Sequence, residues 1–233
     1  MIRWAAAISL LLLCSWMPGV AMDRFLAVRP RVMALGVNPY NAPSDDTPKS
    51  MTFYPGEGLQ IEAGITDSDW TLFAGANHDD AHKSEVHDFM FGNDHQRHED
   101  RQQWLSDRFV LGLRLHPSYQ NPNRVKPQFG IHASYGWVRR SVDEQFFEQF
   151  GDHFHTGSAH ASQTSHGILG YGAELGFVIS GTSPVALSLA GQIDHLQAAI
   201  NHDSEWIFGQ TTSANVFAFQ IGLEYRFCRE KVE

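Results

Sequence analysis

Histidine is the residue type in this sequence with the widest capacity for chemistry. The 233 residues contain 13 histidines, and many alternate with carboxylates, as in the segments NHDDAH (residues 77–82) and DHQRHED (residues 94–100). Neutral imidazoles together with a carboxylate suit Zn²⁺, Ni²⁺ or Cu²⁺. On a helix, His78 and His82 would share one face. The candidate ligands of such a loop-borne transition-metal site are His78, Asp79, His82, His87, His95, His98, His153 and His155.

Two other interpretations of these histidines stay open. No cysteine and no tight ligand motif accompanies them, so the segments also fit ordinary solvated polar loops that bind no cofactor. Because histidine changes charge near neutral pH, the same loops would also respond to acid.

A second candidate chemistry is acyl hydrolysis. His132 and Ser134 are two residues apart, so on a strand they lie on one face, and Glu174 or Glu62 would complete a set of base, nucleophile and acid.

The elements that must position these residues are strands, because apolar residues recur at every second position. The last stretch alternates most regularly, with Phe217, Phe219, Ile221, Leu223, Tyr225 and Phe227 on one side. Eight such stretches are expected, at residues 31–38, 58–66, 69–78, 107–116, 127–138, 166–180, 185–197 and 214–227. The fold class that follows is all-β, an eight-stranded antiparallel up-and-down barrel.

The other face of these stretches indicates which side of the barrel wall meets water. It is rich in glycine, including Gly36, Gly64 and Gly112, and has no lysine. A narrow barrel interior needs small residues and a few charges that can pair, whereas a water-washed exterior would carry many charges. The apolar face therefore points to lipid, and a soluble lipocalin-type barrel, which buries that face, is the alternative. The expected lumenal network is Glu62, Arg108, Arg114, His132, Glu174, Asp194, Gln220, Glu224 and Arg226.

The connections between the stretches alternate in length. Residues 66–69, 117–126 and 181–184 are short, whereas 38–58, 79–107, 139–165 and 198–213 are long and polar. Short periplasmic turns and long external loops are typical of bacterial outer-membrane barrels. Within one long connection, Val142 to Phe154 carries four phenylalanines at helical spacing. It fits an interfacial helix, a patch for a surface partner, or a loop that folds on itself.

The amino end fits an export signal. A positive start at Met1-Ile2-Arg3, an apolar run from Trp4 to Trp16 and small residues before Ala21 predict a signal peptide over residues 1–21 and a mature barrel domain over residues 22–233. Cleavage would remove Cys14 and leave Cys228 alone, so no internal disulfide is expected. The formal net charge of −9 argues against nucleic acid as a partner.

The closing stretch carries a family resemblance. Phe219 to Phe227, ending in Tyr-Arg-Phe, resembles the last strand of small outer-membrane barrels of the OmpA/OmpX kind. The resemblance implies a Gram-negative outer membrane, lipid and lipopolysaccharide as surroundings, and insertion by the barrel assembly machinery. His132, Ser134 and a later Glu also resemble in outline the lipid A deacylases of this barrel size. Here, however, His132 and Ser134 face the lumen, and Tyr135 stands where those enzymes have Asn.

The interpretation we favour is a small, monomeric outer-membrane barrel with a filled polar lumen, without enzymatic activity, whose long His/Asp-rich loops serve a structural or surface-interaction role. Loop-borne metal binding and a lipid A acyl hydrolase activity are the alternatives. A porin is disfavoured, because eight strands enclose an interior just wide enough to be filled by side chains.

Overall fold

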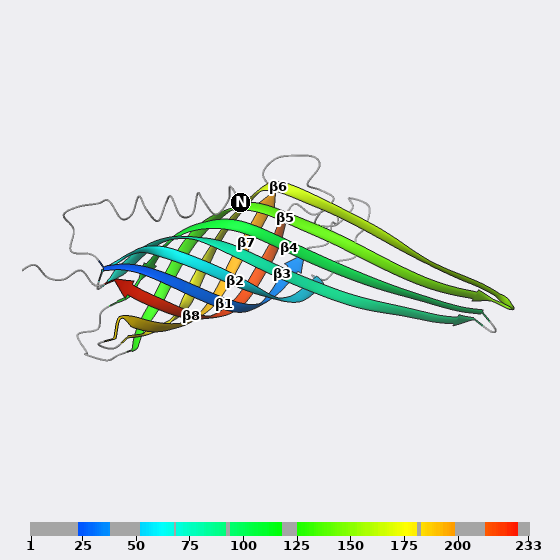
Figure 1. The fold of residues 1–233 in the computed structure, drawn as a ribbon, viewed down its shortest axis with the longest axis horizontal. Helices are drawn as coiled ribbons and strands as arrows, with labels where there is room; N and C mark the ends of the chain where they lie inside the picture. Colours follow the sequence, from blue (N-terminus) through cyan, green and yellow to red (C-terminus); the bar gives the residue numbers. More distant parts are fainter. Residues whose placement is uncertain are drawn as a thin grey trace, which may run out of the picture.

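The computed structural model describes residues 23–37, 52–67, 69–91, 94–117, 125–180, 183–198 and 213–227. These residues form one closed barrel in which every strand pairs antiparallel with its neighbours in the chain, and β1 pairs with β8 (Figure 1). The strands are β1 (Asp23–Val37), β2 (Thr52–Thr66), β3 (Trp70–Phe91), β4 (Asp94–Leu115), β5 (Val125–Phe150), β6 (His153–Ser180), β7 (Val185–Ala198) and β8 (Ser213–Phe227). The predicted eight-stranded up-and-down barrel is confirmed.

The predicted orientation of the barrel wall is also confirmed. Along β4, Phe109, Leu111 and Leu113 are exposed on the outside, while the alternate residues Arg108 and Arg114 are buried inside. The other strands follow the same alternation, so the barrel carries an apolar exterior around a polar interior. This is the arrangement of a transmembrane barrel, whose exterior faces hydrocarbon. Within the described residues, no helix is long and apolar enough to cross a bilayer.

The first strand differs from its prediction in length and in facing. It begins at Asp23 rather than at residue 31, and Met33, Leu35 and Val37 are buried toward the lumen. Gly36, expected in the lumen, shares the outward register of Val32. The predicted signal peptide (residues 1–21) and parts of the connections 38–58 and 198–213 lie outside the described residues.

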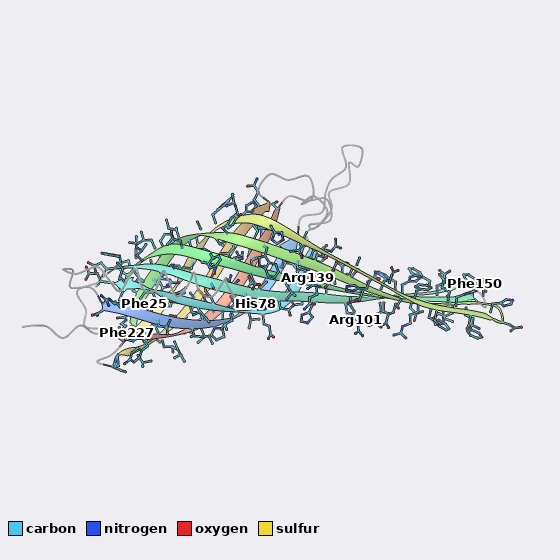
Figure 2. All side chains as sticks on the ribbon, turned by 45° about the horizontal axis from the view of Figure 1, so that its top comes forward. Phe25, His78, Arg101, Arg139, Phe150 and Phe227 are labelled. Atoms are coloured by element: carbon cyan, nitrogen blue, oxygen red, sulfur yellow. The ribbon has the colours of Figure 1, made fainter. Side chains whose placement is uncertain are left out.

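The largest departure from the prediction is at the outer end of the barrel. The connections 79–107 and 139–165, expected to be loops, are continuations of β3, β4, β5 and β6. These strands leave the barrel together as one four-stranded antiparallel sheet, here called the projecting sheet, whose far end lies near Phe150 (Figure 2). Of the three interpretations of Val142–Phe154, the interfacial helix is wrong, because those residues form the end of β5 and the start of β6, joined by the turn Gly151–Asp152.

A β-bulge marks the place where β6 leaves the barrel wall. Gly136 pairs with Ile168, but its neighbour Trp137 pairs with His166, so Gly167 has no residue opposite it on β5. Gly167 has a φ of 76°, which a residue with a Cβ adopts only at a cost. Because of the extra residue, the alternation of inward- and outward-facing side chains along β6 is reversed between the barrel and the projecting sheet.

Candidate functional site

In the half of the lumen away from the projecting sheet, one arginine lies between two carboxylates. Arg114 donates to Glu62, with Nη1 2.7 Å from Oε2, and Arg114 also bonds Glu174. Arg29 donates from Nε to the same Oε2 of Glu62 over 2.9 Å. All four side chains are almost fully buried. Buried ions of this kind are stable only when paired and hydrogen-bonded, as they are here.

A second layer lies nearer the outer end. Arg108 donates to Asp79 over 2.8 Å and to Asp194 over 3.1 Å, so it joins β3 to β7 across the lumen. His132 hydrogen-bonds Asp194, with Nε2 2.7 Å from Oδ1. Arg31 donates from Nε to Asp79 over 2.7 Å. The opposite charges of this layer therefore alternate around the ring of strands.

The structure brings all nine residues of the expected lumenal network into the lumen. Gln220 donates to Glu174 over 3.2 Å, and Arg226 donates to Glu224 over 2.8 Å. Sequence reasoning missed Arg29 because the first strand was begun at residue 31, and missed Arg31 because the two faces of that strand were exchanged. It also assigned Asp79 to a metal site. The alternation of Leu26, Val28, Pro30 and Val32 was the signal that could have found these arginines.

An apolar layer closes the lumen at its outer end. Its largest members are Tyr54 and Trp104, whose rings meet edge-on with centroids 5.7 Å apart. Arg140 lies above Trp104, with its guanidinium carbon 5.2 Å from the ring centroid. The layer consists of Met33, Leu35, Val37, Tyr54, Ala81, Trp104, Val138, Ile168, Leu196, Ala214, Val216 and Ala218. Together with the charged layers, it fills the lumen with side chains.

The residues considered for acyl hydrolysis are all part of this filling. Ser134 and His132 are buried, and Ser134 Oγ accepts from Arg108 Nη1 over 3.3 Å. His132 makes its hydrogen bonds to Asp194 and Gln192, while Glu174 and Glu62 bind Arg114. An acyl chain that arrives from the membrane would meet the outside of the wall, not these groups.

The projecting sheet has two faces. Its inner face continues the lumenal side of the wall, and its outer face continues the lipid-facing side. Histidine–carboxylate pairs join neighbouring strands on both faces. In the sheet, the β3–β4 seam has His95–Asp88 at 2.5 Å, the β4–β5 seam has His98–Glu144 at 3.4 Å, and the β5–β6 seam has His160–Asp143 at 2.5 Å. His78–Asp107, at 2.6 Å, is a pair of the same kind on the barrel wall just below.

The residues considered as metal ligands are spread over three environments. Asp79 lies in the lumen, where it binds Arg31 and Arg108. By strand register, His78, His82 and His95 lie on the outer face, and His87, His98, His153 and His155 lie on the inner face. The interpretation of His78 and His82 as a shared helix face is wrong, because both lie on β3. Across the described ranges, no group of three His, Cys, Asp or Glu is placed to hold a metal ion.

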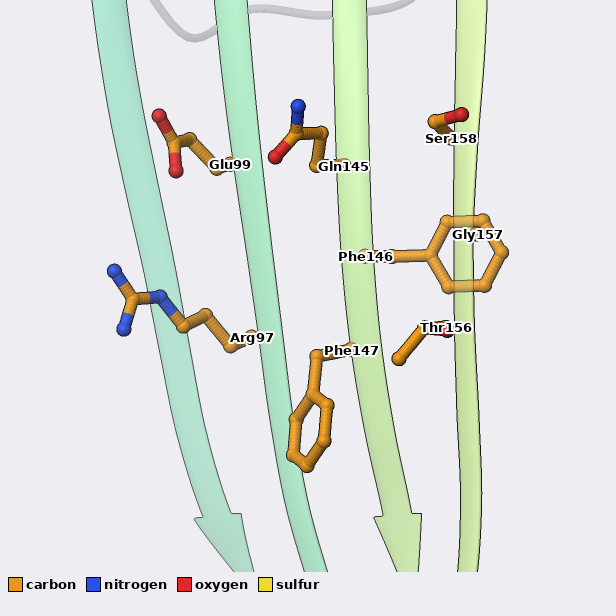
Figure 3. A pocket seen from close by; sticks show the side chains of 8 residues that line it. All are labelled: Arg97, Glu99, Gln145, Phe146, Phe147, Thr156, Gly157 and Ser158. Carbon is orange, nitrogen blue, oxygen red and sulfur yellow. The ribbon is translucent and has the colours of Figure 1, made fainter.

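The outer face carries a shallow groove of about 460 Å³ near the far end of the sheet. Arg97 and Glu99 come from β4, Phe147 from β5, and Thr156 from β6 (Figure 3). The Phe146 ring lies against Gly157 of the neighbouring strand, in the space that a Cβ would need. The groove offers one cation, one anion and one aromatic ring to a solute.

The two edges of the projecting sheet differ in chemistry. On the β3 side, β2 pairs no further than Ala81, and the free edge beyond it carries Lys83, Glu85 and Asp88. A hydrogen bond from Lys83 lowers the pKa of Glu85, so this edge holds a charged pair. On the β6 side, the last pair with β7 is Ile168 with Ala198. Residues 153–167, which lie beyond it, contain no Lys, Arg, Asp, Glu or Pro.

No family model and no curated protein matches the chain. Similar solved structures include the Neisserial surface protein NspA, with 13% identity, 87% of this chain and 97% of that chain covered, and a TM-score of 0.44. Ail of Yersinia pestis has 13% identity, coverage of 89% and 100%, and a TM-score of 0.40. OprG of Pseudomonas aeruginosa has 13% identity, coverage of 91% and 99%, and a TM-score of 0.41.

The fold itself is fixed by the closed ring of paired strands, the apolar exterior and the charged, filled lumen. A closed antiparallel barrel with an even number of strands and an apolar belt is the architecture of outer-membrane proteins. The chain is a small bacterial outer-membrane β-barrel with a four-stranded sheet that projects from its outer end.

Proposed function

We propose that this protein is a non-enzymatic surface-interaction protein, and that the projecting sheet accepts an extended segment of a partner protein along the free edge of β6. The observation that carries the proposal is the difference between the two edges. Lysine, other charges and proline are the devices by which sheet edges avoid pairing with other chains. The β3 edge has charges, and residues 153–167 of β6 have none of these devices.

The backbone geometry supports the same mode of binding. Over residues 153–166, β6 is paired with β5 on one side, while on its other side no described residue pairs with it. At every second residue along this edge, the backbone N–H and C=O are therefore available to hydrogen-bond a further strand. An added strand gains affinity from main-chain hydrogen bonds and specificity from alternate side chains. The small side chains of Ala159 and Ala161 leave room for a partner's larger ones.

The filled lumen supports a role outside the barrel. In the described part of the barrel, charged pairs occupy its middle and an apolar layer closes its outer end. The barrel then serves as a monomeric membrane anchor, placed by the barrel assembly machinery among outer-membrane lipids, and the function lies in the projecting sheet.

The test is selection of peptide ligands on the intact protein in detergent or nanodiscs. Peptides selected from a displayed random library should protect the backbone amides of residues 153–166 from hydrogen exchange, and should leave the β3 edge unchanged. The double variant Ala159→Lys/Ala161→Lys should abolish this binding, since charges on an edge strand oppose strand addition. Ser84→Lys on the β3 edge is the matched control. Protection on the barrel or on β3, or equal binding by both variants, would refute edge pairing by β6.

A further inference from the structure

The far end of the projecting sheet exposes large apolar side chains. We call this region the distal tip and define it as residues 87–91, 94–98 and 146–156. The exposed fractions are 75% for Met90, 62% for Phe154, 47% for Phe89 and 43% for Phe150. Exposed apolar groups concentrated at one place mark an interaction site.

These apolar side chains lie on both faces of the sheet. By strand register, Met90, Phe147 and Phe154 lie on the outer face, where the rings of Phe147 and Phe154 have centroids 6.1 Å apart. Phe89 and Phe150 lie on the inner face. A flat protein surface could cover only one face, so the occupant must surround the tip. A bilayer interface surrounds whatever enters it.

The protein's own membrane cannot be this bilayer. On β5, the sheet continues for 12 residues from Arg139 to Phe150 beyond the barrel. At about 3.3 Å per residue, this places the tip roughly 40 Å beyond the barrel mouth. Figure 2 shows Phe150 at the end of the sheet that lies farthest from the barrel. The bilayer that meets the tip therefore belongs to an apposed membrane.

The charge of the tip depends on its histidines. The tip has four carboxylates, one arginine and five histidines, so its charge is −3 with neutral histidines and +2 with all of them protonated. Histidine is the side chain that changes charge between about pH 5 and 8. An acidic medium thus gives the tip the sign that anionic lipid headgroups attract.

On the inner face, the charged neighbours of the histidines are carboxylates. His98 faces Glu144 and Glu148 on β5, at 3.4 and 3.9 Å, and pairs in register with His87 on β3. His87 lies 3.8 Å from Glu85 on its own strand.

The remaining histidines of the tip have similar surroundings. On β6, His155 is in register with Glu148, and His153 is in register with Phe150 and follows Asp152. On the outer face, His95 lies 2.5 Å from Asp88 on β3, and toward β5 it meets the Phe147 ring and the uncharged Gln149. Carboxylates are the charged groups nearest to these histidines, apart from Arg97, which lies two residues from His95 on the same face.

We propose that the distal tip is an acid-dependent docking site for an anionic phospholipid bilayer of an apposed membrane. The turn Gly151–Asp152 meets the bilayer first, and the aromatic side chains of both faces enter the interfacial headgroup region, where aromatic residues partition favourably. Entry stops at that boundary, because open sheet edges do not occur in hydrocarbon. The proposal goes beyond strand addition to β6, which uses one edge of the sheet and shares only residues 153–156 with the tip.

The experiment is vesicle flotation with the intact barrel held in nanodiscs. Vesicles of phosphatidylcholine with phosphatidylserine are compared with vesicles of phosphatidylcholine alone, at about pH 5 and about pH 8. The protein should float with the anionic vesicles at the lower pH. The double variant Phe150→Ser/Phe154→Ser should bind the anionic vesicles at least about tenfold more weakly than the wild type, because it loses two apolar anchors. Val86→Ser is the matched control, since Val86 is equally exposed (50%) on the same sheet but lies nearer the barrel.

A second readout locates the contact directly. In the Phe154→Trp variant, brominated lipids should quench the added indole at the lower pH only. Heat-modifiable gel migration verifies that each variant is folded. Failure of the wild type to float, equal flotation of wild type and the tip variant, or an equal loss with Val86→Ser would overturn the proposal. Binding of the tip to a soluble protein but to neither vesicle would do so as well. The variant Ala159→Lys/Ala161→Lys lies outside the tip, so it should lose peptide binding at β6 and still float, and the two proposals fail separately.

Discussion

Arg108 on β4 donates from Nη1 to Oδ2 of Asp194 on β7 over 3.1 Å, through the centre of the barrel. The same carboxylate accepts from Gln192 over 2.8 Å and hydrogen-bonds His132. One side chain thus connects three strands.

Replacing this carboxylate should destabilise the barrel strongly. Asp194→Asn leaves Arg108 with one anionic partner instead of two, and removal of one member of a buried ion pair costs about 3 kcal/mol or more. The free energy of unfolding, measured by urea titration in detergent with tryptophan fluorescence, gives the cost. Glu99→Gln is the control, because its pair with the exposed Arg101 should contribute under about 1 kcal/mol. Equal effects of the two variants would show that the lumenal pair is not stabilising.

The bulge residue should tolerate few replacements. Gly167→Val should cost about 1–2 kcal/mol or more, because a left-handed backbone conformation strains a β-branched residue, whereas Gly167→Asn should cost less. The visible result should be faster hydrogen exchange in β6 beyond residue 167 than in β7. Gly191→Ala is the control, since space is open at that position and its φ is not positive. Equal protection in the Val and Asn variants would argue against strain at the bulge.

The apolar layer at the barrel mouth should be as important for stability as the charges. Trp104 is 3% exposed, so Trp104→Ala should cost about 3–5 kcal/mol, and Trp104→Phe should cost less. Urea titration followed by circular dichroism measures both. In planar bilayers, the wild type should show no open-channel conductance. Steady conductance by the wild type would contradict the filled lumen.

One histidine at the end of the barrel opposite the projecting sheet should make stability depend on pH. Burial lowers the pKa of His116 to about 4, and its Nε2 lies 2.9 Å from Thr71 Oγ1. The unfolded state, with a pKa near 6.5, binds the proton first as the pH falls. The contribution of His116 is therefore complete above about pH 6.5 and decreases as the pH falls toward about 4.

The measurement is the urea midpoint across this range. His116→Asn should show a smaller loss of stability on acidification than the wild type, while the exposed His166→Asn should follow the wild type. If His116→Asn and the wild type have parallel pH profiles, His116 is not a source of the acid sensitivity.

The barrel could be predicted from sequence because a membrane imposes opposite chemistry on the two faces of each strand. From Phe217 to Phe227 every second residue is a large apolar one, and in the structure this apolar set faces outward. The lumenal charges follow from the same rule, since Glu62, Glu174 and Arg114 stand on polar faces of alternating strands.

The projecting sheet could not be predicted in this way, because water lies on both of its faces. His98 and Glu144 are cross-strand partners, yet each looks like a loop residue in isolation. Phe146, Phe147, Phe150 and Phe154 have helical spacing in sequence, but a turn at Gly151 separates the last from the others. When both faces of a strand are polar, apolar residues do not recur at every second position, so the sequence gives no sign of which strands pair and which side chains meet.

Arg29 on the first strand has a consequence for the order in which the barrel can assemble. Its guanidinium lies 2.9 Å from Glu62 on β2, 2.8 Å from Ser188 on β7 and 3.8 Å from Glu224 on β8. Two of these three partners are in the last strands to be synthesised. In a nascent chain that ends before β7, Arg29 has only one of its three partners, Glu62. Arg29 therefore gains its full set of partners only when β7 and β8 are in place and the ring closes between β1 and β8.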